Sequence, residues 1–237
     1  MKEIKILHLF PKLLSLYGEY GNLAVLRSAL EENGCEVTVD IYEGGHLSLD
    51  GYGLIYVGAG TEDNLLEAVK RLMPHRDAIQ SSIEQGDLWL ATGNAMTLFG
   101  ASIARGEATT EALGCFSYTT AIFDNKRYLG DVLTAEAFGG QFVGFVNTSS
   151  VFDGITSPLL QLQLGAKLGN DKQSPEDGIH LHNFYGTQLI GPMLAKNPHF
   201  LQHICREMTD NEITLSPDSY ACKAYAIALS ELKNRMQ

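Results

Sequence analysis

The stretch DLWLATGNAMTLFG, residues 87–100, contains the pattern that decides the fold. Its apolar run at 88–91 predicts a buried strand, the next residues form a sharp turn, and the remainder opens a helix. Strand, sharp turn and helix together form a nucleophile elbow, which presents a reactive side chain at the top of a sheet. Here the turn holds Thr92, Gly93 and Asn94, with no cysteine or serine. The pattern therefore predicts an elbow that lacks its usual nucleophile.

Strand and helix patterns alternate along the first half of the chain. Strands are predicted at 4–10, 35–42, 54–57 and 88–91, and helical spacing at 23–30, 65–72 and 78–85. This alternation predicts right-handed crossovers and a parallel sheet. Ligands bind beyond the carboxyl ends of such strands. The turns GAGTEDN (58–64) and ATGNAM (91–96) both fall there, so we expect them to lie near one another.

The second half of the chain is richer in strand patterns. These are predicted at 115–123, 127–135, 141–147, 159–165 and 178–186, and a helix follows at 197–208. A last helix is predicted from Ser216-Pro217-Asp218, an N-cap with proline in the first turn. No linker or repeat divides the chain. We expect a single α/β domain over 1–237, with a parallel-containing central sheet flanked by helices.

The composition excludes several classes of protein. The 237 residues carry a formal net charge of -11, which argues against nucleic-acid and anionic-membrane partners. No apolar run approaches the roughly 20 residues that cross a bilayer, so no membrane insertion is expected. The N-terminus MKEIKILHLFPK is a poor signal peptide. The four cysteines lack CxxC or zinc spacing, and we expect reduced thiols in a cytoplasmic protein.

Neither a cofactor nor a metal is expected. GAGTEDN lacks both the three-glycine dinucleotide fingerprint and the Gly-Lys-Ser/Thr of a P-loop, so a tight turn explains it better than phosphate binding. His180 and His182 alternate on a predicted strand and would share one face, as some metal pairs do. No third ligand occurs at a useful spacing. The two histidines are therefore interpreted as ordinary polar residues of an edge strand.

Cys115 and Thr92 are the only plausible alternative nucleophiles. Cys115 begins a β-rich stretch and is expected to be buried. Thr92 precedes the turn, so the pleat is expected to point it away from the elbow position. A threonine hydroxyl with no base beside it is also almost unionised at neutral pH. Arg127, in FDNKRYLGD, is interpreted from the residues alone as a solvated surface charge.

Five motifs, in one order over nearly the whole chain, resemble the class I glutamine amidotransferases of the CobB/CobQ type. The family shows LY-x-D-x-GN, a GGG turn, an arginine followed by Gly-Asp or Gly-Asn, GFEN, and GTYLHGP-x-LPKNP. This chain has LYGEYGN at 16–22, GAG at 58–60, Arg127 with Gly-Asp at 130–131, GFVN at 144–147 and GTQLIGPMLAKNP at 186–198. The last match is long and specific. Within the family, the resemblance is strongest to the GatD subunits of lipid II isoglutaminyl synthase.

The resemblance implies that the two main catalytic positions are empty. The family elbow reads CGGYQ-x-LG, and a comparison without gaps over 86–100 places its cysteine at Gly93. The histidine of GTYLHGP falls at Ile190, and the acidic position that supports it falls at Glu19. Glutamine hydrolysis needs a thiolate, a proton-transferring histidine and backbone amides that hold the oxyanion. Gly93 has no atom with which to attack, and Ile190 cannot carry a proton.

The resemblance also implies four substrate-binding positions. Arg127 matches an arginine that holds the glutamine substrate, so an amino acid with a carboxylate is a possible ligand. Ala59 and Gly60 of the glycine turn, and Asn94 after the nucleophile position, complete the predicted set.

Three functions remain open at this stage. The first is a pseudoenzyme: an amidotransferase-like subunit without glutaminase chemistry that acts with a Mur-ligase-like (MurT-type) partner in cell-wall precursor amidation, in peptidoglycan synthesis, or in its regulation. The second is an active glutaminase or amidotransferase with an unusual nucleophile, using Cys115, Thr92 or His182. The third is a module that binds glutamine or a related amino acid through Arg127 and the 58–60 turn.

Overall fold

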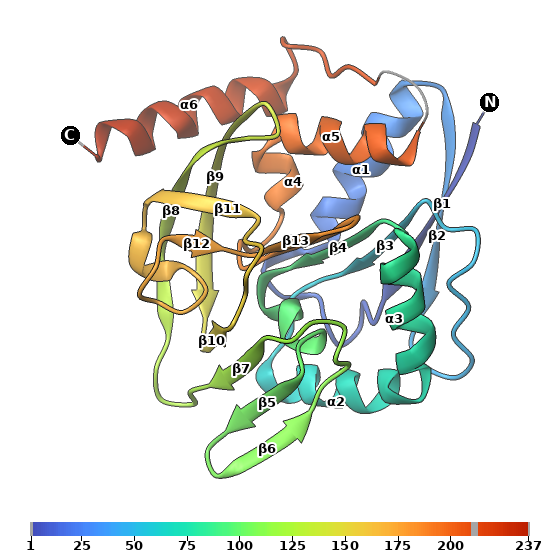
Figure 1. The fold of residues 1–237 in the computed structure, drawn as a ribbon. Coiled ribbons are helices and arrows are strands. Elements are labelled where there is room, and N and C mark those ends of the chain that lie inside the picture. The colour runs from blue at the N-terminus through green and yellow to red at the C-terminus, as the bar shows by residue number, and fades with distance from the viewer. Residues whose placement is uncertain (1, 210–212, 237) are drawn as a thin grey trace.

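A six-stranded sheet forms the centre of the computed structural model, which describes residues 2–209 and 213–236 (Figure 1). Its strand order is β13-β14-β4-β3-β1-β2, parallel from β14 to β2 and antiparallel between β13 and β14. The predicted α/β class with a parallel-containing central sheet is therefore confirmed. The strands are β1 (Lys2–Leu9), β2 (Cys35–Tyr42), β3 (Leu54–Val57), β4 (Trp89–Thr92), β13 (Ile179–Leu181) and β14 (Phe184–Thr187).

Helices cover both faces of this sheet. One layer contains α1 (Tyr20–Glu32), α4 (Met193–Lys196) and α5 (Pro198–Met208); the other contains α2 (Glu62–Leu72) and α3 (Arg76–Gln85). Strand β3 contributes to both layers, because its side chains alternate between the two faces of the sheet. Leu54 and Tyr56 pack in the core with α1 and α5, whereas Ile55 and Val57 pack in the core with α2 and α3. A strand buried on both faces is apolar throughout, as LIYV is.

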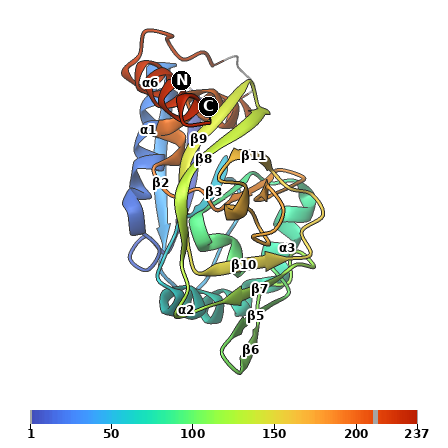
Figure 2. The same ribbon diagram turned by 90° about the vertical axis from the view of Figure 1, so that its left-hand side faces the viewer.

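Two four-stranded sheets lie beside the central sheet (Figure 2). One has the order β10-β7-β5-β6, and the other has the order β12-β11-β8-β9. Helix α6 (Tyr220–Asn234) crosses β8 and β9, with Leu232 in one apolar cluster with Leu133 and Val143. The strands are β5 (Ser102–Arg105), β6 (Ala108–Glu111), β7 (Thr119–Ile122), β8 (Tyr128–Ala137), β9 (Gly140–Thr148), β10 (Ser150–Asp153), β11 (Leu160–Leu164) and β12 (Glu176–Asp177).

Several predicted elements differ in extent from the structure. The elbow opens not into an α-helix but into a 3-10 helix, η3 (Gly93–Leu98). Strand 178–186 is two strands joined by a turn at His182, whose φ is +52°. Helix α6 begins after Ser219, not Ser216, because the Ser219 side chain accepts the N–H of Cys222 at 3.2 Å. The predicted N-cap at Ser216 is therefore wrong by one turn. No helix in the described parts of the chain has both the length and the apolarity to cross a bilayer.

Buried His8 on β1 predicts that the protein loses stability in acid. The residue is 5% exposed, and within the described residues its Nε2 has no hydrogen-bond partner. Burial lowers the pKa of His8 from 6.5 to about 4. The unfolded chain therefore binds a proton between those two values that the folded chain does not. The stabilisation is complete above pH 6.5 and is lost as the pH falls towards 4.

We expect His8→Gln to remove about 3 kcal/mol of the pH-dependence of the unfolding free energy between pH 7 and pH 4. Urea unfolding at a series of pH values measures it. The matched control is His46→Gln, an exposed histidine. If the stability of His8→Gln falls between pH 7 and pH 4 by as much as that of the wild type, His8 is not the group that titrates.

Candidate functional site

The elbow lies where β4 meets η3. Gly93 has a φ of +62°, and its N–H donates to the carbonyl of Leu189 at 3.1 Å. A residue with a side chain pays about 1–2 kcal/mol in this left-handed region, whereas glycine adopts it freely. Thr92, one residue before, has an extended backbone. The chain therefore makes the sharp turn of an elbow, and glycine occupies its apex.

Gly93, Ala59 and Ile190 lie together. A Cβ atom added to Gly93 would stand 2.7 Å from the Cβ of Ala59 and 3.5 Å from Cγ2 of Ile190. Residues 93 and 190 therefore face each other, as the resemblance requires of a nucleophile and its base. The Ala59 methyl fills the space in which a side chain at 93 would begin. A third glycine in the 58–60 turn, as in GGG, would leave that space open.

The side chain of Asn94 pairs with the backbone of Gly60. Its Oδ1 accepts the Gly60 N–H at 3.1 Å, and its Nδ2 donates to the Gly60 carbonyl at 2.8 Å. These bonds confirm that the turns after β3 and β4 meet. In an elbow, the oxyanion is held by the N–H after the nucleophile and by an N–H from a neighbouring loop. The N–H of Gly60 already has an acceptor, so an oxyanion would have to displace Asn94.

Glu19 accepts four hydrogen bonds in the core beneath the elbow. Its Oε1 accepts the N–H of Gly191 at 2.8 Å, and its Oε2 accepts the Asn22 amide at 3.0 Å. The hydroxyls of Tyr56 and Thr92 also donate to Oε2. Burial raises the pKa of Glu19, while the four hydrogen bonds act in the opposite direction. The carboxylate therefore ties α1, β3, β4 and the loop after Ile190 into one network.

Arg127 lies on the rim of a separate cavity. Its Nη2 is 3.1 Å from Oε1 of Glu62, and its Nη1 is 3.0 Å from Oδ1 of Asn147. Ser149 also donates to that Glu62 oxygen, at 2.6 Å. The cavity, of about 290 Å³, is lined by Glu62, Phe123, Asp124, Asn125, Lys126, Arg127 and Ser149. A ligand carboxylate would therefore compete with Glu62 for the guanidinium.

Comparison with known proteins shows that the chain is similar in sequence to GatD subunits. The chain is 26% identical over 205 residues to the GatD subunit of glutamine-hydrolysing lipid II isoglutaminyl synthase from Streptococcus pneumoniae, covering 82% of this chain and 76% of that one. It is also 26% identical over 214 residues to the GatD subunit from Staphylococcus aureus, covering 90% of this chain and 87% of that one. The chain is a GatD-like, glutamine amidotransferase-like protein.

The fold of the GatD-like chain matches solved amidotransferases. A crystal structure of a glutamine amidotransferase superposes with a TM-score of 0.57 at 16% identity, covering 85% of this chain and 98% of that one. At this identity the likeness concerns the fold alone. No model of a known protein family matches the chain.

The alternative nucleophiles of the GatD-like chain are poorly placed. Burial raises the pKa of the Cys115 thiol to about 12, which removes the thiolate at neutral pH. A carboxylate does lie beside Thr92, because the threonine hydroxyl donates to Glu19. Thr92 and Glu19 are completely buried, however, so no substrate reaches the Thr92 hydroxyl. Sequence reasoning missed this pair because 73 residues separate its members.

The two histidines of the GatD-like chain do not form a metal pair. His180 lies on β13 and stacks on Tyr185 with ring centroids 4.4 Å apart. His182 lies in the turn beyond that strand and is exposed, so the expected shared face of a strand is wrong. Within residues 2–209 and 213–236, no group of three or more His, Cys, Asp or Glu could hold a metal ion.

Proposed function

We propose that the chain is a GatD-like subunit that has lost glutaminase chemistry and acts, in the cytoplasm, with a Mur-ligase-like partner in amidation of a cell-wall precursor or in its regulation. The observation that carries this proposal is the packing of Ala59 and Ile190 around the position that a Cβ at residue 93 would take. This packing brings positions 93 and 190 together, and the Ala59 methyl obstructs a side chain at residue 93.

The hydrogen bonds of Asn94 and Glu19 support the same proposal. Asn94 occupies the Gly60 N–H that would hold an oxyanion. Glu19 is the residue that would support a histidine at 190, and it is bonded instead to its own neighbours. An elbow that retains its backbone but fills its reacting space is consistent with selection for the scaffold and not for hydrolysis.

The partner is inferred from the relatives. Both GatD relatives are named as subunits of lipid II isoglutaminyl synthase, so they work within a larger enzyme. The family resemblance implies that such subunits associate with Mur-ligase-like proteins. A subunit that no longer hydrolyses glutamine can still contribute to that enzyme by binding the partner.

Ammonia release from glutamine tests the loss of activity. We expect a rate about 10⁴–10⁶-fold below that of the Streptococcus pneumoniae GatD complex, assayed in parallel, because nucleophile and base are both absent. The chain is assayed alone and after co-purification from its native host. Glutamine turnover that disappears in Cys115→Ala or Thr92→Val would overturn the proposed inactivity. Purification without any Mur-ligase-like protein would contradict the proposed partner.

A further inference from the structure

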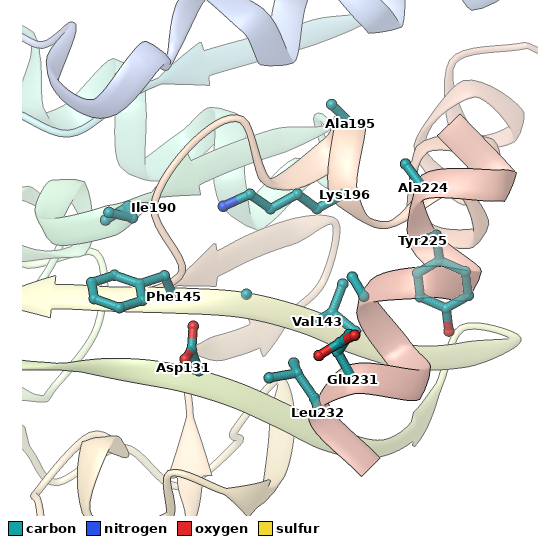
Figure 3. A pocket seen from close by; sticks show the side chains of 12 residues that line it. Asp131, Val143, Phe145, Ile190, Ala195, Lys196, Ala224, Tyr225, Glu231 and Leu232 are labelled. Atoms are coloured by element: carbon teal, nitrogen blue, oxygen red, sulfur yellow. The ribbon is translucent and has the colours of Figure 1, made fainter. Parts of the chain in front are cut away.

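A cavity of about 610 Å³ lies between α6, α4 and the β8–β9 hairpin (Figure 3). Its walls are mainly apolar and include Val143 and Phe145 of β9, Ile190, and Ala228 and Leu232 of α6. Pockets of roughly 300–1,000 Å³ with apolar walls and a few polar groups are typical of small-molecule sites. The motifs at 130–131, 144–147 and 186–198 contribute residues to this lining, but the proposed function assigns no ligand to the cavity.

Lys196, the last residue of α4, projects its ammonium group into the cavity towards Ile190 (Figure 3). Within the described residues, no hydrogen bond to Nζ and no carboxylate within 4.0 Å is recorded, although Asp131 and Glu19 act on it at longer range. Burial lowers the pKa of Lys196. A partly buried charge without a direct partner is unfavourable, and an anion that enters the cavity would relieve that cost.

The acidic groups of the cavity limit the charge of the ligand. Asp131 already pairs with Arg235, whose Nη1 lies 2.5 Å from its Oδ2. Glu231 of α6 lines the same cavity and is exposed, so it would repel a second negative charge on a ligand. The apolar walls in between favour an uncharged hydrocarbon body.

We propose that this cavity binds a monocarboxylate with a short apolar tail, its carboxylate on Lys196 and its tail between β9 and α6. The inference is independent of the proposed function, because it requires neither a partner nor the loss of hydrolysis. Ile190 forms a wall of the cavity and also faces Gly93. A bound ligand would therefore contact the residue that replaces the catalytic base.

Calorimetric titration with hexanoate tests the site, with hexan-1-ol and the dicarboxylate adipate as comparisons. For a ligand of this size we expect a hexanoate dissociation constant of about 0.1–10 mM. Hexan-1-ol and adipate should each bind more weakly. Lys196→Met should weaken hexanoate binding about 10- to 100-fold, the usual effect of losing a charged partner, and leave hexan-1-ol unchanged.

Two further variants separate the site from general effects. Lys223→Met removes an exposed lysine of α6 that does not line the cavity, and it should leave hexanoate binding unchanged within about twofold. Ala224→Trp places a large side chain in the cavity lining and should abolish binding of both hexanoate and hexan-1-ol. Equal hexanoate affinity in the wild type and Lys196→Met would overturn the proposal. No saturable binding of hexanoate to the wild type would overturn it too.

Discussion

Glu19→Ala is expected to lower the free energy of unfolding by about 3–5 kcal/mol, since buried donors that lose their acceptor cost about 1–3 kcal/mol each. The carboxylate accepts bonds from Asn22, Tyr56, Thr92 and the N–H of Gly191, and all of these groups are buried. The loss is smaller than the sum over four donors. Tyr56 can still bond to Thr92 and to Asn22, at 3.0 Å each.

Urea unfolding at neutral pH measures the effect, with Glu31→Ala as the matched control. Glu31 lies on α1 and forms an exposed ion pair with Arg27, so its loss should cost at most about 1 kcal/mol. Glu19→Gln adds a further measurement. It keeps the size of the side chain but turns one acceptor oxygen into a donor that faces other donors. If Glu19→Ala costs no more than Glu31→Ala, water already satisfies the network and the core beneath the elbow is not dry.

Most of the central sheet could be predicted because β1, β2, β3 and β4 each carry their own local signal. LIYV at 54–57 is apolar throughout, and CEVTVDIY at 35–42 alternates, so both strands have the predicted bounds. Strand β6 carries no such signal. Its residues ATTE are all exposed, and only pairing with β5 makes them a strand. Tertiary context decides such a strand, and a single sequence does not contain that context.

The site could be predicted only as a set of positions. The resemblance identified Gly93, Ile190 and Glu19, and the structure brings 93 and 190 together. The sequence alone does not reveal the role of Ala59. A small residue in a turn is ordinary, and only the structure shows that Ala59 packs against the elbow apex, 34 residues later in the chain. The pairing of Asn94 with Gly60 was hidden for the same reason. Contacts between distant turns depend on register, which periodicity does not report.

Gly93→Cys is expected to destabilise the chain when made alone and to be tolerated better together with Ala59→Gly. The new Cβ would stand 2.7 Å from the Ala59 Cβ, and overpacking of this kind costs about 1–3 kcal/mol. The left-handed φ adds about 1–2 kcal/mol. Ala59→Gly removes the first cost and leaves the second. Unfolding of the two single variants and the double variant therefore measures a coupling between residues 59 and 93.

Reactivity of the introduced thiol tests whether these residues account for the loss of chemistry. Labelling by a diazoketone analogue of glutamine, followed by mass spectrometry, reports attack by Cys at 93. We expect slow labelling once Ala59→Gly, Gly93→Cys and Ile190→His are combined. Adding Asn94→Gly should accelerate it about 10²–10³-fold, the usual value of one oxyanion donor, because the N–H of Gly60 becomes free.

Gly93→Ala in the same background is the matched control, since it adds a Cβ without a thiol and should remain unlabelled. Two results would contradict this account. If Gly93→Cys alone is as stable as the wild type, Ala59 does not obstruct the apex. If the fourfold variant folds but stays inert, the glutamine pocket has changed beyond these four positions. In that second case Glu62 is the next residue to replace. Its carboxylate pairs with Arg127, the residue expected to hold the carboxylate of glutamine.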